Sequence, residues 1–415
     1  MGGPADENGY PMIESVKGGV VASAGFRTAS IHCGLKSDGA SRDLAVLLSD
    51  RPTQSAAMFT TNRVKSAAVR WSEKRVRENN IRAIVVNAGN ANACTGKRGE
   101  EDAERTARVA ASLLGLAPSQ VFLASTGIIG VPLPVEKIEY GLRSAVPRLS
   151  GGIEAGEAFA LAIMTTDTVP KSVAFRFQAS RKQLTLGGAT KGVGMIAPNM
   201  ATMLCFLTTD ASISQAALDR ALRDAVEQSF NRVTVDGHMS TNDTVVILAN
   251  GAAGNELIEE GTPDYATFCH TLDIACLSLA KMMVRDGEGA TRMIRVEVTG
   301  ALAREDATKA ARAVANSPLV KAAVNGGDPN WGRIISAAGY SGAEMEEERA
   351  KLWIGDLLVF DNGNPTGCPK TELAAFVRTP EVHFRIDLGM GAESDTYWTC
   401  DLSKEYVSIN ADYHT

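Results

Sequence analysis

The sequence has little of what marks secreted, membrane-spanning or disulfide-stabilised proteins. Its seven cysteines are odd in number and scattered, with no pair at the spacing of a metal site. This usage favours reduced, buried thiols in a cytoplasm. No apolar run approaches the roughly 20 residues that a membrane-spanning helix requires, and the polar stretch 1–19 lacks a secretory core. We therefore expect a cytoplasmic protein with no targeting segment and no membrane partner.

Clustered positive charge and paired histidines are also missing. The net charge is -6, and a nucleic-acid groove would need a clustered excess of Lys and Arg. The five histidines stand apart in the sequence, without the spacing that would hold a metal. We therefore expect no nucleic-acid partner and no metal, and small-molecule chemistry remains as the favoured class.

The 415 residues are enough for one large domain or two to three fused ones. Alternating helical and strand-like patterns indicate an α/β fold with mixed sheets, and a composition shift after about residue 300 indicates a smaller C-terminal domain. Helices are expected at residues 101–114, 135–149, 214–230, 263–285 and 304–315. Strands are expected at residues 82–86, 121–124, 172–177, 203–207, 244–249, 293–298, 351–359 and 382–388. Tight, positioned loops are expected at the glycine-rich segments 87–96, 187–194 and 251–254.

A candidate for covalent chemistry lies in residues 191–204, where a glycine-hinged loop turns into an apolar run at Thr202. For an arbitrary threonine, a place in a strand is the simpler interpretation. A threonine hydroxyl is a weak nucleophile unless a base lies beside it, and a cut between Ala201 and Thr202 would supply the α-amine of Thr202 as that base. Such an amine titrates at about 7.7 to 8.0 when unperturbed, and burial would lower its pKa further.

Residues 191–204 resemble the self-cleavage signature of the ornithine acetyltransferases, also called glutamate N-acetyltransferases. Members of this family cut themselves between the residues that match Ala201 and Thr202. Further matching motifs follow in the family's order at residues 87–94, 125–127, 164–167, 229–232, 240–243, 286–291, 328–333 and 409–415. Because so many motifs match in one order, Thr202 becomes the expected nucleophile. The chain departs from the common pattern at His238 and Met239, where an aspartate and a threonine are usual.

The resemblance implies roles for individual residues. Thr126 and Gly127 match the family's oxyanion hole, which suits a hydroxyl and a backbone N–H aimed at developing negative charge. Composition alone would make residues 125–127 a strand-ending turn. Lys191 and Glu288 have the charges that a ligand with a carboxylate and an ammonium group requires, although isolated charges of this kind usually lie on a solvated surface. The residues that match the family's substrate contacts are Thr165, Lys191, Thr202, Glu288, Asn410 and Thr415.

The resemblance also implies a ping-pong reaction and an architecture. Thr202 would take the acetyl group from N-acetylornithine, release ornithine, and pass the acetyl group to glutamate. An amide is broken and another is made, so no cofactor is expected. Some family members also accept acetyl-CoA, so the resemblance leaves open acetyl-CoA as a second donor, which the residues do not decide. The implied fold is a layered α/β/β/α sandwich with mixed sheets plus a smaller C-terminal α/β domain.

Self-cleavage would divide the chain into two fragments. Residues 1–201 would form an α fragment within the sandwich. In the β fragment, residues 202–300 would complete the sandwich and residues 301–415 would form the smaller domain. The resemblance implies a heterotetramer with two copies of each fragment.

Two other functions stay open at this point. A self-cleaving amidase or aminopeptidase of related fold would use the same nucleophile with water in place of glutamate, and it would release free acetate. A silenced homologue would serve only for binding or assembly. The retained Ala201, Thr202, Thr126, Gly127 and Lys191 speak against silencing.

Overall fold

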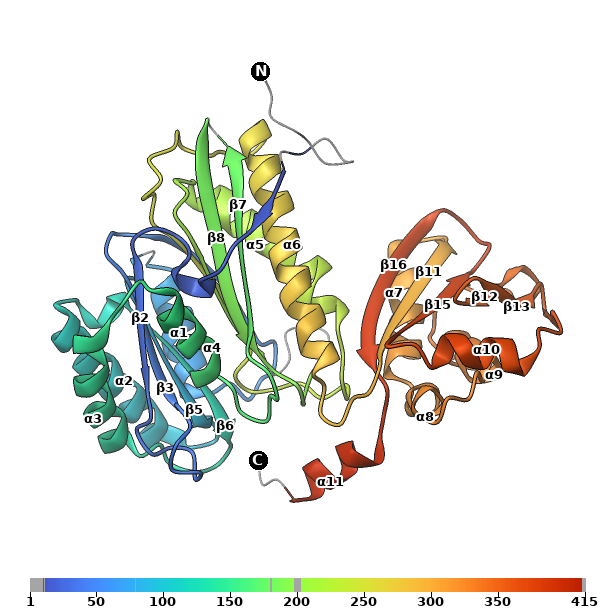
Figure 1. Ribbon diagram of the computed structural model, residues 1–415, viewed down its shortest axis with the longest axis horizontal. Helices are drawn as coiled ribbons and strands as arrows, with labels where there is room; N and C mark the ends of the chain where they lie inside the picture. Colours follow the sequence, from blue (N-terminus) through green and yellow to red (C-terminus); the bar gives the residue numbers. More distant parts are fainter. Residues whose placement is uncertain (1–9, 11, 79, 180, 198–202, 413–415) are drawn as a thin grey trace.

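The computed structural model describes residues 10, 12–78, 80–179, 181–197 and 203–412, which form a main body and a C-terminal unit beside it (Figure 1). The main-body strands are β1 (Glu14–Ser15), β2 (Phe26–Ile31), β3 (Leu44–Ser49), β4 (Gln54–Phe59), β5 (Ala83–Asn90), β6 (Val121–Ile128), β7 (Lys171–Ala179), β8 (Lys182–Lys191), β9 (Leu204–Thr209) and β10 (Thr244–Ala249). The main-body helices are α1 (Ala67–Val76), α2 (Gly96–Leu114), α3 (Val135–Ala145), α4 (Ile153–Ala162), α5 (Gln215–Gln228) and α6 (Pro263–Arg285).

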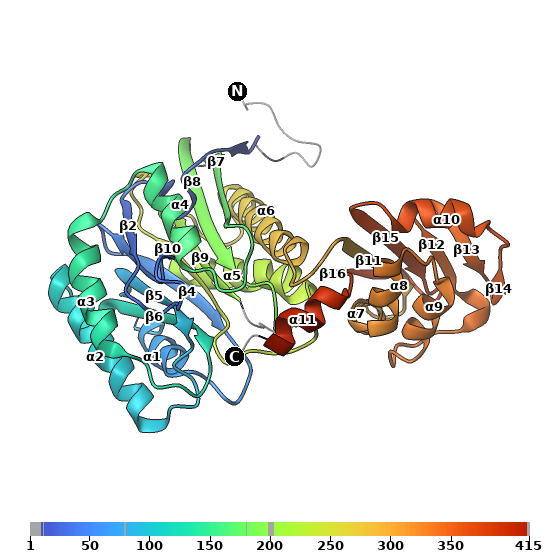
Figure 2. The same ribbon diagram turned by 60° about the horizontal axis from the view of Figure 1, so that its bottom comes forward.

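The main body contains two sheets with both faces covered. A six-stranded sheet has the order β1-β7-β8-β9-β10-β4, and a four-stranded sheet has the order β2-β3-β5-β6. Alternation along β9 shows how the layers form: Leu204 and Phe206 face the four-stranded sheet, whereas Cys205 and Leu207 pack among residues of α5 and α6. Helices α2 and α3 cover the outer face of the four-stranded sheet (Figure 2). The arrangement confirms the predicted α/β/β/α sandwich with mixed sheets.

The C-terminal unit has its own six-stranded mixed sheet, with the strand order β14-β13-β12-β15-β11-β16, and helices that pack against it. Its elements are β11 (Met293–Ala301), α7 (Arg304–Asn316), α8 (Pro318–Gly326), α9 (Trp331–Gly339), β12 (Lys351–Ile354), β13 (Leu357–Asp361), β14 (Asn364–Pro365), α10 (Lys370–Val377), β15 (Glu381–Asp387) and β16 (Glu393–Cys400). Because β11 belongs to this sheet, the sheet begins at Met293, before the expected boundary near residue 300. The expected division at residues 201 and 202 lies outside the described residues.

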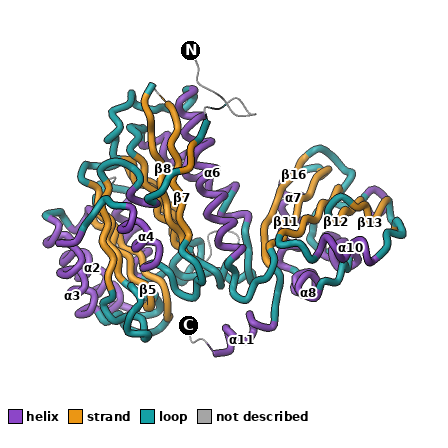
Figure 3. The backbone as a smooth tube through the Cα atoms, viewed as in Figure 1, coloured by secondary structure: helices purple, strands orange, loops and turns teal. Residues whose placement is uncertain are grey.

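Helix α11 (Lys404–Asp412) leaves the C-terminal unit and returns towards the main body, as Figures 1 and 3 show. The Tyr406 hydroxyl donates to Asp236 Oδ2 at 3.2 Å. Asp236 also accepts the backbone N–H groups of Met195 and Ile196 at 2.6 and 3.0 Å. Helix α11 is therefore anchored to the segment that follows β8.

Two predicted loops begin too early in the sequence, and one predicted strand is divided into two. The segment 87–96 begins inside β5, and the segment 187–194 begins inside β8. The glycines of β8 serve close packing: a Cβ at Gly187 would lie 2.0 Å from the Gly19 carbonyl oxygen, and one at Gly188 would lie 2.6 Å from Leu207. The expected strand 351–359 is a hairpin of β12 and β13, which turns at Gly355 with φ +59°.

Helix α6 corrects the expectation that no apolar run could span a membrane. Among the described helices it is the one whose length and mean hydropathy of 1.2 would suit such a span. However, 56% of its apolar window is buried inside the protein. Leu272, Leu279 and Met283 are fully buried in the core between α5 and the six-stranded sheet. The apolar character of α6 is therefore that of a core helix.

Candidate active site

A cavity of about 100 Å³ lies at the edge of the main body, at the C-terminal ends of β6 and β8. Residues 240–242, which precede β10, also line it. The predicted site residues that line it are Thr126, Gly127, Thr165, Lys191, Glu288 and Asn410. Residues that were not predicted but also line it include Ala91, Thr166, Met195, Thr241 and Asn242. Ala201, Thr202 and Thr415 lie outside the described residues. The structure thus brings together every predicted site residue that it describes.

Lys191 supplies a buried cation at the end of β8, with 3% of its surface exposed. Its Nζ donates to Thr126 Oγ1 at 3.3 Å. Burial lowers the pKa of Lys191, and the nearby carboxylates of Asp167 and Glu288 oppose this shift. An ammonium group has three donors, so Lys191 can hold Thr126 and a ligand carboxylate at the same time.

Glu288 supplies the carboxylate on the other side of the cavity. Its Oε1 accepts a hydrogen bond from Thr166 Oγ1 at 2.8 Å, and its Oε2 accepts one from Asn410 Nδ2, also at 2.8 Å. An added Cβ at Gly194 would lie 2.4 Å from Glu288 Oε2, so the loop after β8 packs directly on the carboxylate. Helix α11 therefore contributes to the site through Asn410, which fixes the orientation of Glu288.

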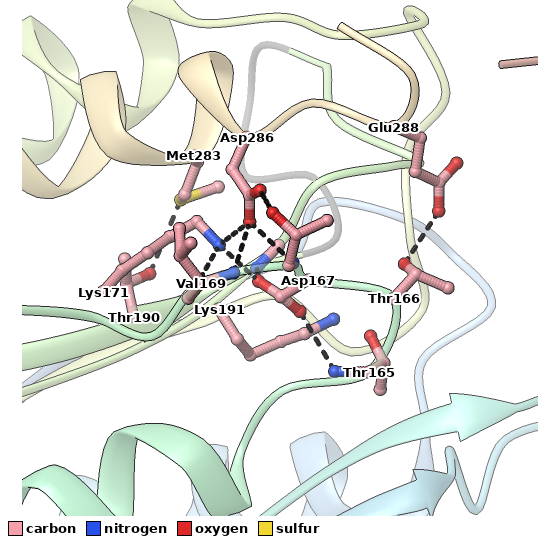
Figure 4. A network of polar contacts seen from close by, with 12 residues as sticks. Thr165, Thr166, Asp167, Val169, Lys171, Thr190, Lys191, Met283, Asp286 and Glu288 are labelled. Atoms are coloured by element: carbon pink, nitrogen blue, oxygen red, sulfur yellow. Dashed lines mark hydrogen bonds and ion pairs between the residues drawn. The ribbon is translucent and has the colours of Figure 1, made fainter. Parts of the chain in front are cut away.

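A buried ion network lies beside Lys191, as Figure 4 shows. Lys171 Nζ pairs with Asp167 Oδ1 at 2.8 Å and with Asp286 Oδ2 at 2.6 Å. Asp167 also accepts the backbone N–H groups of Thr165 and Gly192. Burial would raise the pKa of Asp167, but the neighbouring lysine ammonium groups hold it below its ordinary value. The network joins the segments that carry Thr165, Lys191 and Glu288.

Sequence reasoning gave no role to Thr166, Asp167, Lys171 or Asp286. The signal that could have found three of them was present, because residues 164–167 and 286–291 are among the motifs that match the family. Lys171 lies outside those motifs, at the start of β7. Its role depends on ion pairs with two carboxylates, Asp167 and Asp286, which are far apart in the chain.

Gly127 has a backbone conformation that only glycine adopts without strain. It pairs with Gly89 in the parallel ladder of β5 and β6, and its φ is +128°. An added Cβ would lie 2.3 Å from the Gly89 carbonyl carbon and 2.5 Å from the Asn90 nitrogen. Both neighbours are backbone atoms and cannot rotate away. The end of β6 at Gly127, where a strand-ending turn was the simpler expectation from composition, is therefore a paired strand that depends on close contact between two glycines.

Gly127→Ala is expected to destabilise the protein by more than the strain of a positive φ alone, which is about 1 to 3 kcal/mol, because the ladder must also open. Gly130→Ala is the matched control, since Gly130 has φ +82° and no atom within 4 Å of an added Cβ. Thermal unfolding of both variants measures the difference. Equal melting temperatures for the two variants would contradict the expected clash.

The fold and the cavity define an α/β protein with a recessed site for a small ligand that carries both charges. The ArgJ family model matches residues 27–415, and the chain belongs to the ArgJ family. It is 48% identical to the arginine biosynthesis bifunctional protein ArgJ of Symbiobacterium thermophilum, over 97% of this chain and 100% of that protein. These matches confirm the family that the sequence motifs indicated.

Two solved structures of the family cover about half of this chain. A crystal structure of the arginine biosynthesis bifunctional protein ArgJ from Bacillus halodurans covers 50% of this chain and 98% of its own, at 44% identity and a TM-score of 0.49. A structure of ornithine acetyltransferase complexed with ornithine, from Mycobacterium tuberculosis, covers 45% of this chain and 98% of its own, at 38% identity and a TM-score of 0.42.

Proposed function

We propose that this chain is an ornithine acetyltransferase of arginine biosynthesis, which transfers the acetyl group of N2-acetyl-L-ornithine to L-glutamate. The observation that carries the proposal is that Lys191, Glu288, Thr126 and Gly127 line one cavity. The name of the relative from Symbiobacterium thermophilum, which places that protein in arginine biosynthesis, supports the pathway. The products are L-ornithine and N-acetyl-L-glutamate.

The two charges of the cavity match those of the proposed donor. N-acetylornithine carries an α-carboxylate, which Lys191 would bind, and a side-chain ammonium, which Glu288 would bind. Thr126 and Gly127 would then donate to the acetyl oxygen as it gains negative charge. Thr165 and Asn410 line the same cavity and complete the proposed contacts among the described residues. Thr415 is proposed as a further contact from the family resemblance.

The proposed nucleophile is Thr202, exposed by cleavage between Ala201 and Thr202. Thr202 Oγ attacks the Ala201 carbonyl carbon, and the C–N bond breaks, so the amide becomes an ester and the amine of Thr202 is freed. Water then hydrolyses the ester and releases the Thr202 hydroxyl and the Ala201 carboxylate. In each turnover the same oxygen attacks the acetyl carbonyl, and the ornithine nitrogen leaves with a proton. The glutamate amine then attacks the acetyl ester and releases Thr202. Amide replaces amide, so the reaction needs no metal or nucleotide, and acetyl-CoA is a second proposed donor.

The cut would leave two fragments that share one sheet. Strands β9 and β10 of the second fragment lie between β8 and β4 of the first, with an antiparallel ladder on each side. Separation would expose the buried faces of both strands to water. The proposal therefore keeps the fragments together, as two copies of each in a heterotetramer located in the cytoplasm.

A direct assay tests the proposal. Purified protein with N-acetylornithine and glutamate is expected to produce ornithine and N-acetylglutamate in equal amounts, measured by mass spectrometry. Release of free acetate without N-acetylglutamate would indicate that the enzyme hydrolyses the amide and does not transfer the acetyl group. No turnover of either kind, together with an uncut chain, would indicate a silenced homologue.

Glu288→Gln is expected to raise KM for N-acetylornithine about 10- to 100-fold, because a hydrogen bond to a charged group contributes about 1.5 to 3 kcal/mol. KM for glutamate is expected to change little, since its side-chain carboxylate gains nothing from Glu288. Steady-state kinetics with each substrate varied in turn measures the difference. Glu297→Gln is the control, because Glu297 pairs with His383 in the C-terminal unit. An equal rise in both KM values would contradict the assignment.

A further inference from the structure

Asn242 connects the two main-body sheets just before β10 begins. The side chain is buried, and its Nδ2 donates to the Ala91 carbonyl oxygen at 2.8 Å and to the Ser125 carbonyl oxygen at 2.7 Å. Ser125 directly precedes Thr126 in β6. Asn242 therefore donates both amide protons to backbone carbonyl groups beside the proposed oxyanion hole. These two hydrogen bonds tie that backbone to the start of β10.

Asp243, the next residue, makes the corresponding contact on the other sheet. It is fully buried, and its Oδ1 accepts the backbone N–H of Met203 at 2.9 Å. Met203 directly follows Thr202 in the sequence, so this hydrogen bond fixes the backbone N–H group nearest to the proposed nucleophile among the described residues. A second bond, from the Thr244 N–H to the Met203 carbonyl oxygen at 3.0 Å, holds Met203 from its other side.

The burial of the Asp243 carboxyl group is energetically unfavourable, because a buried polar group loses its hydrogen bonds to water. Its Oδ2 is buried and has no hydrogen-bond partner among the described residues. Burial raises the pKa of Asp243 well above its ordinary value. An apolar side chain at this buried position would leave the Met203 N–H without the acceptor that Asp243 supplies.

We propose that Asn242 and Asp243 are positioning residues that together set the distance between the nucleophile and the oxyanion hole. Asn242 fixes the segment that carries Thr126, and Asp243 fixes the backbone of Met203, the residue after Thr202 in the sequence. Because Asn242 and Asp243 are adjacent, one short segment of backbone would position both the oxyanion hole and the nucleophile. The inference rests on the proposed function. A displacement of about 1 Å at a reacting group can lower the rate about 100-fold.

The far ends of the same strands provide matched controls. Asn250 follows β10, is buried, and donates from Nδ2 to the Ala24 carbonyl oxygen at 2.9 Å. Asp210 follows β9, is buried, and accepts the backbone N–H groups of Thr185 and Ala24 at 2.7 and 3.2 Å. These two side chains make the same kind of contact at the opposite edge of the sheet, away from the cavity.

The test compares Asn242→Ala and Asp243→Ala with Asn250→Ala and Asp210→Ala in the full chain. The first pair is expected to lower kcat for transfer and the rate of self-cleavage about 10- to 100-fold, with KM for N-acetylornithine nearly unchanged, because positioning affects the reacting geometry and leaves the binding groups in place. The control pair is expected to lose similar thermal stability and to keep kcat. Asp243→Asn, which retains an acceptor oxygen, is expected to recover most of the activity.

Equal kcat in both pairs would overturn the inference, while a wild-type chain that cuts itself and transfers acetyl groups would leave the proposed function in place. A wild-type chain that does neither would remove both. If Asn242→Ala fails to fold, the comparison of Asp243→Ala with Asp243→Asn decides, since these variants differ in the acceptor for Met203. Failure of Asp243→Asn to recover activity, in a folded protein, would also overturn the inference.

Discussion

Thr202→Ala is expected to remain a single chain of 415 residues and to lose acetyl transfer. Alanine has no oxygen to attack the preceding carbonyl or to carry the acetyl group, so both self-cleavage and turnover lose their nucleophile. Loss of a nucleophile of this kind lowers kcat by about a millionfold in a serine protease. The effect here is expected to leave no transfer above the background reaction.

Intact mass and a denaturing gel measure the first part of this expectation. The wild-type protein should yield fragments of residues 1–201 and 202–415, and Thr202→Ala should yield neither. Thr202→Ser is the control, because it retains a hydroxyl and should still cut. A wild-type chain of full mass, or an alanine variant that is cut at the same bond, would contradict the assignment of Thr202.

Thr126→Val is expected to lower kcat about 100- to 1,000-fold, the usual loss for one oxyanion-hole donor. The structure supplies the reason. Lys191 Nζ donates to Thr126 Oγ1, so the hydroxyl proton of Thr126 is not used on Lys191 and is free to donate into the cavity. A hydroxyl that accepts from a cation is also a stronger donor. Valine keeps the branched shape and removes this donor.

Steady-state kinetics distinguishes this effect from lost binding. We expect KM for N-acetylornithine to stay within a few-fold, because the donor acts mainly on charge that develops in the transition state. Thr126→Ser should retain most activity. Thr271→Val is the control, since Thr271 is fully buried in α6 and bonds within its own helix. A Thr126→Val enzyme with wild-type kcat would exclude Thr126 from the oxyanion hole.

The layered fold was predictable where apolar periodicity is strong. The expected bounds of α6 and β10 agree with the structure, because apolar residues there recur with one clear period. The prediction failed at β8, where Gly187 and Gly188 resemble a loop in composition. Only the approach of the Gly19 backbone and of Leu207 shows why glycine stands inside that strand.

The candidate site was predictable only through motifs, and its supports were not. Lys191 and Glu288 could be assigned because the motifs around them match the family. The pairing of Lys171 with Asp286 spans 115 positions, and no local pattern indicates such a contact. The contacts of Asn242 and Asp243 likewise depend on how two sheets stack, which periodicity does not specify.

The order of strands in the six-stranded sheet has a consequence for how this protein is made and lost. Strands β9 and β10 lie between β8 and β4, so neither proposed fragment contains the whole sheet. A fragment alone would present unpaired strand edges, which favour association with other chains. Under the proposed cleavage, we therefore expect the uncut chain to fold first and the cut to follow. Once unfolded, the cut protein would have to reassemble from two separate fragments. We therefore expect the rate of unfolding to set the half-life of its activity at high temperature, and we expect the lost activity not to return on cooling.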